Sequence, residues 1–190
     1  MQLNLPQLEF FPWWAFLIYW IISASRLKQV KTEEAQAGRL FHIAVMVLAF
    51  YLMFRTSFGI EILEHRFIAD SLPLRYLGIA LTWLGIAFAI WARYCIGANW
   101  SGRVTLKVDH QLIQSGPYAF VRHPIYTGLL VANAGAALFI GEWRCLAALA
   151  IFLAEISRKA LKEEKLMLSE FGDRYGEYRR QAGFLVPRFF

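Results

Sequence analysis

Five apolar stretches separated by polar segments dominate the pattern of this sequence, at residues 10–24, 40–54, 76–92, 125–141 and 145–156. A helix needs about 20 apolar residues to cross a bilayer core of about 30 Å, and flanking Tyr, Trp and Arg side chains can extend the first three stretches. The last two are joined by a brief turn, and the fifth is especially short, so we expect a close helical hairpin that is barely long enough to cross the membrane. The pattern predicts an all-α, polytopic membrane protein with about five transmembrane helices.

Residues 158–170 keep helical spacing although they are charged, so the fifth helix is expected to continue out of the membrane. Gly172 then predicts a helix stop, because glycine adopts the left-handed conformation that ends helices. Tyr175 and Tyr178 follow in a short amphipathic segment. The sequence therefore predicts a cytoplasmic C-terminal helical segment within one domain of residues 1–190.

Composition and charge agree with a membrane location. The chain is 58% hydrophobic and 18% charged, with a mean hydropathy of +0.41, which excludes a disordered chain. The net charge of +6 would suggest nucleic acid on a soluble protein, but 16 of the 20 Lys and Arg lie in alternate segments between and after the apolar stretches. This asymmetry follows the positive-inside rule. It predicts an N-terminus outside, residues 93–124 and 157–190 on the cytoplasmic side, and no nucleic-acid partner.

The first apolar stretch is expected to be retained in the mature protein. No Lys or Arg precedes it, whereas a cleavable signal peptide opens with basic residues. An integral protein with its N-terminus outside suits a prokaryotic inner membrane, and the endoplasmic reticulum is the alternative location.

The outer loop at residues 55–75 contains Glu61, Glu64 and His65, which could suggest a metal site. No second His or Cys lies at ligand spacing, however, so a solvated loop is the better interpretation and no metal is predicted.

The cytoplasmic segment before the fourth helix carries the first cluster of candidate chemistry. Pro124 suits the first turn of that helix, where its missing N–H costs little. Arg122 and His123 would then lie at the helix entrance, where free N–H groups favour a carboxylate, and Tyr118 and Tyr126 would add aromatic walls. The alternative is that these side chains only anchor the helix at the membrane interface.

A second cluster lies on the extension of the fifth helix, where Lys159 and Glu163 share one face and Glu164 follows directly. One carboxylate could receive a cationic group of a ligand, although a solvated helix with salt bridges is the alternative. Together, the two clusters could hold a zwitterion with aromatic rings around a flat base.

Small residues on the fourth helix, Gly128, Ala132 and Ala136, form a stripe that allows a second helix to approach closely. Packing within the hairpin is the expected role of this stripe. Asn133, a polar residue within the apolar run, is expected to bond a neighbouring helix.

The ordered motifs of residues 110–128 and 163–187 resemble the isoprenylcysteine carboxyl methyltransferase and phospholipid methyltransferase superfamily of integral membrane enzymes. The matching elements are His110-Gln-Leu-Ile, Gly116-Pro117-Tyr118, Arg122-His123-Pro124-x-Tyr126-x-Gly128, Glu163-Glu164-x-Leu166, Phe171-Gly172, Tyr175-x-x-Tyr178 and Pro187. The run from Arg122 to Gly128 is the most specific of them. Residues 1–97 match only as three generic membrane helices, which leaves residues 98–190 as the cofactor-binding half.

The resemblance implies a methyltransferase that uses S-adenosyl-L-methionine without a Rossmann domain, and the chain indeed has no glycine fingerprint after a strand. It implies the cofactor ligands His110, Leu112, Ile113, Tyr118, His123, Pro124, Tyr126 and Glu163. The catalytic candidates are Lys159, Glu163 and Glu164. A lipophilic small-molecule or lipid-modified acceptor would enter sideways from the membrane lipid, between helices.

One position departs from the family pattern. Relatives that methylate a prenylcysteine carboxylate have an Arg four residues before the first Glu of the pair, where this chain has Lys159. Lysine keeps the charge but lacks the planar fork that grips a carboxylate.

The predicted function is carboxyl methylation of an isoprenylcysteine-like substrate at the cytoplasmic membrane face. The alternatives are a phospholipid amine N-methyltransferase, an NADPH-dependent membrane reductase of related architecture, and a scaffold that keeps only the fold.

Overall fold

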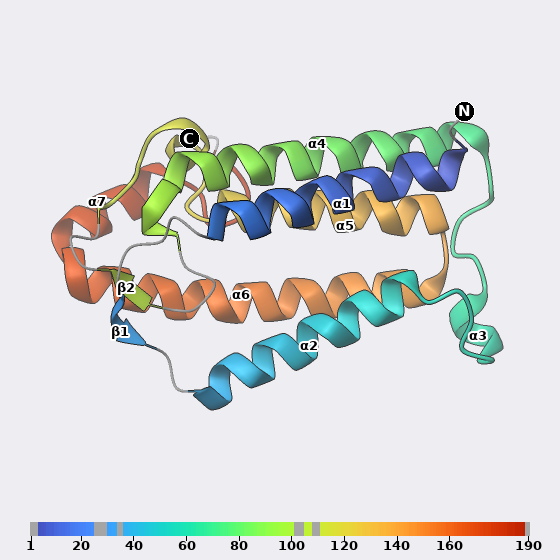
Figure 1. The fold of residues 1–190 in the computed structure, drawn as a ribbon, viewed down its shortest axis with the longest axis horizontal. Helices are drawn as coiled ribbons and strands as arrows, with labels where there is room; N and C mark the ends of the chain where they lie inside the picture. The colour runs from blue at the N-terminus through green and yellow to red at the C-terminus, as the bar shows by residue number, and fades with distance from the viewer. Residues whose placement is uncertain (1–3, 25–29, 34–35, 101–104, 108–110, 189–190) are drawn as a thin grey trace.

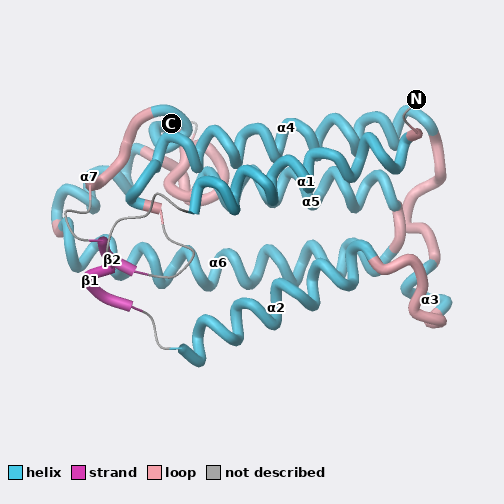
Figure 2. Tube along the Cα trace, in the orientation of Figure 1, coloured by secondary structure: helices cyan, strands magenta, loops and turns pink. Residues whose placement is uncertain are grey.

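The computed structural model describes residues 4–24, 30–33, 36–100, 105–107 and 111–188. Its five long helices are α1 (Leu5–Ala24), α2 (Gln36–Phe54), α4 (Leu72–Ile96), α5 (Pro124–Ile140) and α6 (Trp143–Phe171). Shorter elements are the helices α3 (Glu61–Glu64) and α7 (Asp173–Gln181), the 3-10 turns η1 (Gly97–Asn99) and η2 (Gly116–Ala119), and the strands β1 (Val30–Glu33) and β2 (Thr105–Lys107). The two strands pair antiparallel in a small ribbon outside the helical body (Figure 2). The described fold is thus helical as predicted apart from this ribbon, which the prediction of an all-α fold did not include.

The long helices form two layers (Figure 1). Helices α1, α4 and α5 lie side by side in one layer, while α2 and α6 form the other. The N-terminus and the C-terminus lie at opposite ends of the bundle. The end of α4, the beginning of α5 and α7 meet at the C-terminal end, and the candidate site is located there.

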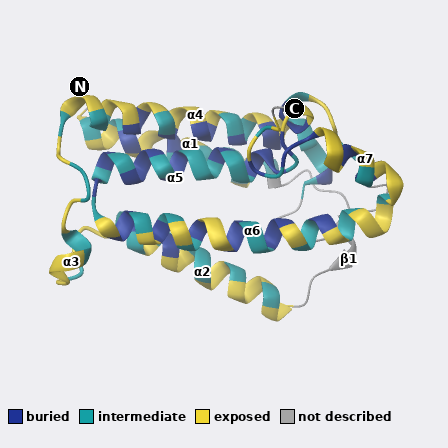
Figure 3. Cartoon of the chain, turned by 180° about the vertical axis from the view of Figure 1, so that it is seen from behind, coloured by how far each residue is buried: buried dark blue, intermediate teal, exposed yellow. Residues whose placement is uncertain are grey.

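Two of the described helical spans, Gln36–Phe54 and Leu72–Asn99, are long and apolar enough to cross a membrane. The outer faces of the layers carry apolar side chains that are largely exposed, such as Trp14 and Ile21 on α1, at 62% and 66% exposed. Figure 3 shows the contrast between these exposed faces and the more buried α5. Contiguous apolar surface of this extent fits hydrocarbon better than water.

Helix α6 is longer than its apolar stretch. It runs for 29 residues from Trp143 to Phe171 without a break, which corresponds to about 43 Å at the rise of an α-helix. It ends where Gly172 takes a positive φ of 52°, as the sequence predicted. The continuous helix carries Lys159, Glu163 and Glu164 from the apolar region to the C-terminal end of the bundle.

Most of the small-residue stripe of α5 packs against α4, and not against its hairpin partner α6. A Cβ built on Gly85 of α4 would lie 2.5 Å from the backbone N of Ala132, and one built on Gly128 would lie 2.6 Å from the carbonyl O of Gly85. The two backbones are therefore nearly in contact, which only glycine permits. The prediction that the stripe serves packing within the hairpin is wrong for Gly128 and Ala132, whereas Ala136 lies in a buried cluster with Cys145 and Ala148 of α6.

Asn133 also differs from its prediction. Its side chain is buried, but the amide Nδ2 donates to the carbonyl O of Leu129, one turn earlier in the same helix, at 2.8 Å. The polar group is thus satisfied within α5 and does not bond a neighbouring helix.

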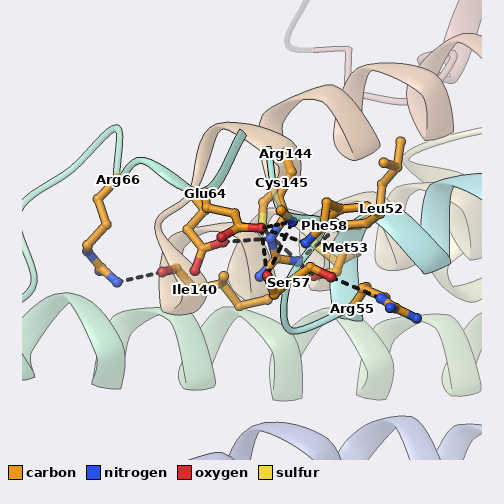
Figure 4. A network of polar contacts seen from close by, with 12 residues as sticks. Leu52, Met53, Arg55, Ser57, Phe58, Glu64, Arg66, Ile140, Arg144 and Cys145 are labelled. Atoms are coloured by element: carbon orange, nitrogen blue, oxygen red, sulfur yellow. Dashed lines mark hydrogen bonds and ion pairs between the residues drawn. The ribbon is translucent and has the colours of Figure 1, made fainter. Parts of the chain in front are cut away.

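Arginine side chains cap the C-terminal ends of two helices at the N-terminal end of the bundle (Figure 4). Arg144 donates to the last carbonyls of α2, at 2.9 Å to Leu52 and 2.6 Å to Met53. Arg66 donates to the carbonyl of Ile140 at the end of α5, at 2.7 Å. Glu64 accepts from Ser57 Oγ at 2.9 Å and from loop backbone N–H groups, so this residue of the outer loop holds the loop itself together.

We expect Gly85→Ala to destabilise the protein by about 1–3 kcal/mol, because the added methyl group would have to push the α4 and α5 backbones apart. Thermal unfolding in detergent would measure the loss as a lower Tm. Gly176→Ala is the matched control, since Gly176 is also helical but a Cβ there meets nothing within 4 Å. Equal Tm values for the two variants would contradict the close α4–α5 contact.

Candidate functional site

A cavity of about 130 Å³ lies at the C-terminal end of the bundle, enclosed by the end of α4, the beginning of α5, α6 and α7. Six of the predicted cofactor ligands line it, namely Leu112, Ile113, Tyr118, His123, Tyr126 and Glu163. Five of these residues lie within residues 112–126, and Glu163 comes from the distant helix α6. The structure thus brings the two predicted clusters together around one space.

The beginning of α5 places His123 and Tyr126. Pro124 is the first residue of the helix, as predicted, and its own side chain is fully buried and does not line the cavity. His123 precedes the helix as its N-cap, and its ring stacks on Tyr126 with 5.7 Å between the centroids and 13° between the planes. Pro124 therefore acts by starting the helix and fixing these two rings.

Glu163 of α6 is bound from two sides. The Tyr126 hydroxyl donates to Glu163 Oε1 at 2.7 Å, and His123 Nδ1 lies 3.5 Å from Glu163 Oε2. His123 Nε2 lies 3.5 Å from Glu164 Oε1 but makes no hydrogen bond, although it is buried. The carboxylate of Glu163 is thus fixed in orientation at the wall of the cavity.

Glu164 faces a different direction. Its Oε1 accepts from Arg122 Nε at 2.5 Å, and Arg179 Nε lies 3.4 Å from its Oε2. The side chains of Arg122 and Glu164 are 10% and 5% exposed, so the ion pair is buried. Glu164 is not among the residues that line the cavity, and its partners lie on α7 and on the segment before α5.

Lys159, the third catalytic candidate, lies one helical turn before Glu163. It is 7% exposed, and its Nζ lies 5.8 Å from the centroid of the Tyr126 ring. One further turn back, Glu155 accepts from Arg158 and lies 2.7 Å from Nδ1 of His42 on α2. Lys159 is therefore close to the site, at the border between the cavity and the helix layer formed by α2 and α6.

The carboxylates and the imidazole of the site each favour the charged form of the other. Burial opposes ionisation of Glu163, but hydrogen bonding to His123 and the charge of Lys159 hold the pKa of its carboxyl below the usual range. Burial opposes ionisation of Glu164 in the same way, and His123 and Arg122 lower its pKa. Burial by itself would lower the pKa of His123, but the two carboxylates raise it above the usual value. The arrangement favours two carboxylates and a protonated imidazole.

The residues that line the cavity differ in part from the predicted set. His110 lies outside the described residues. Asn99, Trp100 and Met167 line the cavity but were not predicted. Trp100 follows the 3-10 turn η1, and the guanidinium of Arg93 lies 4.5 Å from its ring centroid. No local motif marks such a position, because only the turn at the end of α4 brings it to the cavity.

Tyr175 and Tyr178 of α7 are buried and also line the cavity. The Tyr178 hydroxyl donates to the carbonyl O of Tyr118 at 2.7 Å, which joins α7 to the η2 turn. The predicted amphipathic segment is thus the helix that closes the cavity from the C-terminal side. The three-residue spacing of the two tyrosines in the sequence was the signal that placed them on one face of a helix.

Comparison with known proteins gives a consistent result. Residues 78–170 match the model of the isoprenylcysteine carboxyl methyltransferase (ICMT) family. A protein-S-isoprenylcysteine O-methyltransferase of Schizosaccharomyces pombe is 32% identical over 80 residues, which cover 42% of this chain and 34% of that protein. The enzyme of the same name from Tribolium castaneum is 28% identical over 117 residues, covering 60% of this chain and 42% of that protein. The chain thus spans less than half the length of these two relatives.

A solved structure of the eukaryotic intramembrane Ras methyltransferase ICMT resembles the fold. The TM-score is 0.52 at 24% sequence identity, and the match covers 78% of this chain and 62% of that one. The matched family segment contains most of α4, all of α5 and nearly all of α6, and with them His123, Tyr126 and Glu163. Residues 78–170 of this chain thus match the isoprenylcysteine carboxyl methyltransferase family in sequence, and the fold of the chain resembles that of a solved member.

Proposed function

We propose that this protein transfers a methyl group from S-adenosyl-L-methionine to the carboxylate of a lipophilic, isoprenylcysteine-like acceptor. The observation that carries the proposal is the carboxylate of Glu163, which is fixed by Tyr126 and His123 at the wall of a largely aromatic and apolar cavity. The match of residues 78–170 to the family supports the reaction class, and the curated relatives bear the name of this activity.

The residues of the cavity fit the proposed cofactor. An ionised carboxylate at Glu163 suits the ammonium group of a methionine moiety. Tyr118, Tyr175 and Trp100 offer aromatic surface for a flat base, while Leu112 and Ile113 add apolar walls. His110, which the resemblance also implies, would extend this set. When bound, the cofactor would supply an electrophilic methyl group.

Apolar side chains beside Tyr126 suit a hydrocarbon tail. Phe152 and Ile156 of α6 are buried there against Met46 and Phe50 of α2 and against Leu129 of α5. This cluster of side chains lies between helices that would face the bilayer. A hydrocarbon tail that entered sideways would therefore pass from the apolar lipid into an equally apolar protein interior. The proposed acceptor is therefore a lipophilic or lipid-modified molecule taken from the membrane.

Lys159 favours a carboxylate over an amine as the accepting group. It lies beside Tyr126 in a protected position, and Arg158 adjoins it in the sequence. Positive charge would attract an anionic acceptor and repel the ammonium form of an amine. A carboxylate acts as a nucleophile without losing a proton, so Lys159 has only to align it and to exclude water. We place this site on the cytoplasmic side of a prokaryotic inner membrane, following the distribution of basic residues.

Methyl transfer with the purified full-length protein tests the proposal. With radiolabelled S-adenosyl-L-methionine and N-acetyl-S-farnesylcysteine, we expect label in a base-labile methyl ester. The carboxamide analogue of the acceptor is the matched control and should receive none. Base-stable label on phosphatidylethanolamine would instead identify an amine methyltransferase. Binding of NADPH without binding of S-adenosylhomocysteine would overturn the methyltransferase assignment and point to a reductase.

A further inference from the structure

A second hollow, of about 690 Å³, lies on the outer side of the C-terminal segment. Four arginines line it, Arg122, Arg179, Arg180 and Arg188, together with the apolar side chains of Phe184 and Val186. The methyltransferase site proposed above does not use this hollow. The two spaces share only Arg122, whose side chain forms part of the wall of each.

The hollow has a strong excess of positive charge. Arg122 and Arg179 both approach Glu164, whose side chain is 5% exposed. Arg180 and Arg188 are exposed, and no ion pair joins either of them to a carboxylate in the part of the chain that the structure describes. Arg188 instead donates to the carbonyl O of Arg180 at 3.0 Å, which keeps the two residues together. Four guanidinium groups thus face one buried carboxylate.

Backbone hydrogen bonds hold the C-terminal segment that lines the hollow beside the beginning of α5. The N–H of Arg122 donates to the carbonyl O of Gly183 at 2.8 Å, and the N–H of Gly183 donates to the carbonyl O of Phe120 at 3.0 Å. The Thr127 hydroxyl donates to the carbonyl O of Leu185 at 2.7 Å. Helix α5 is apolar, so in a bilayer its first turn would lie near the border between hydrocarbon and water.

The apolar part of the hollow lies at this border. Val186 is 71% exposed although it is aliphatic. The guanidinium of Arg122 lies 5.7 Å from the ring centroid of Phe184, so charged and apolar surfaces adjoin directly. A ligand that fits both must combine an anionic group with a hydrocarbon part.

We propose that this hollow binds the headgroup of an anionic phospholipid. Arginine forks match the oxygen geometry of a phosphodiester, and the exposed Val186 and Phe184 surface would contact the glycerol backbone and the upper acyl chain. The membrane places such lipids at high local concentration at this depth. Neither Arg180 nor Arg188 lines the candidate methyltransferase cavity, so substitutions of these two residues change the hollow alone.

Lipid binding to the full-length protein in a neutral detergent tests the proposal. The probes are short-chain dihexanoyl-phosphatidylglycerol, dihexanoyl-phosphatidylcholine and inorganic phosphate, titrated by native mass spectrometry. We expect tighter binding of the glycerol lipid than of the choline lipid, and roughly 30-fold weaker binding of the glycerol lipid by the double variant Arg180→Gln/Arg188→Gln.

The double variant Lys165→Gln/Arg174→Gln is the matched control. It removes the same charge from exposed positions that do not line the hollow, and it should bind like the unchanged protein. The single variant Arg180→Gln keeps the Arg188 hydrogen bond to the backbone and guards against a folding effect. Equal affinity for the two lipids, equal losses in both double variants, or phosphate binding as tight as that of the lipid would each overturn the proposal.

Discussion

Glu163→Gln should weaken the binding of S-adenosylhomocysteine about 100-fold or more. The substitution keeps the shape of the side chain but removes the charge that an ammonium group would pair with, in a protected site where charge pairs are strong. The amide would also keep only one of the two oxygens that the Tyr126 hydroxyl and His123 approach. Calorimetric titration of the detergent-solubilised variant measures the change, and methyl transfer should fall with it.

Two further variants test whether the charge of Glu163 is the cause of this loss. Glu177→Gln makes the same chemical change at an exposed position on α7 that does not line the cavity, so it should bind the ligand normally. Tyr126→Phe removes a hydrogen bond to Glu163 but leaves its charge, so a smaller loss of about tenfold is expected. Unchanged affinity in a folded Glu163→Gln protein would show that Glu163 does not hold the cofactor.

Arg122→Leu should destabilise the protein by about 3–5 kcal/mol, because it leaves the buried Glu164 without its main partner. The same substitution removes the side-chain hydrogen bonds from Arg122 to the carbonyl O atoms of Arg179 and Ala182. The C-terminal segment should then detach more readily from the beginning of α5. Thermal unfolding in detergent and limited proteolysis of residues 182–188 would report the two effects.

The matched control for this variant is Arg174→Leu, which removes an arginine from an exposed position of α7. The double variant Arg122→Met/Glu164→Met separates lost charge pairing from lost packing. If the unpaired carboxylate is the cause, the double variant should be more stable than Arg122→Leu, because no buried charge remains alone. A Tm of Arg122→Leu equal to that of Arg174→Leu would show that the ion pair does not stabilise the fold.

Local signals in the sequence determined the helices well. The apolar stretch at 125–141 became Pro124–Ile140, and the stretch at 40–54 became Gln36–Phe54. The helix start at Pro124 and the helix end at Gly172 were predicted because fixed φ values and the left-handed conformation act within a few residues. The continuation of α6 as far as Phe171 followed from its spacing for the same reason.

The sequence also identified most of the candidate site, since six of its eight predicted cofactor ligands line one cavity. It could not separate Glu163 from Glu164, which are neighbours in the chain. Successive residues of a helix point about 100° apart, and only the packing of α6 against its neighbours turns Glu163 to the cavity and Glu164 to Arg122.

The partner of a helix face depends on the whole bundle. The stripe of Gly128 and Ala132 signalled a close contact, but a stripe does not specify which helix fills it, and α4 does so here because Gly78 and Gly85 permit the same approach from the other side. Trp100 reached the cavity and Arg122 became part of a buried ion pair for the same reason. The sequence by itself thus determined the elements and their chemistry, whereas the tertiary structure decided which residues meet, because contacts between distant segments have no local signal.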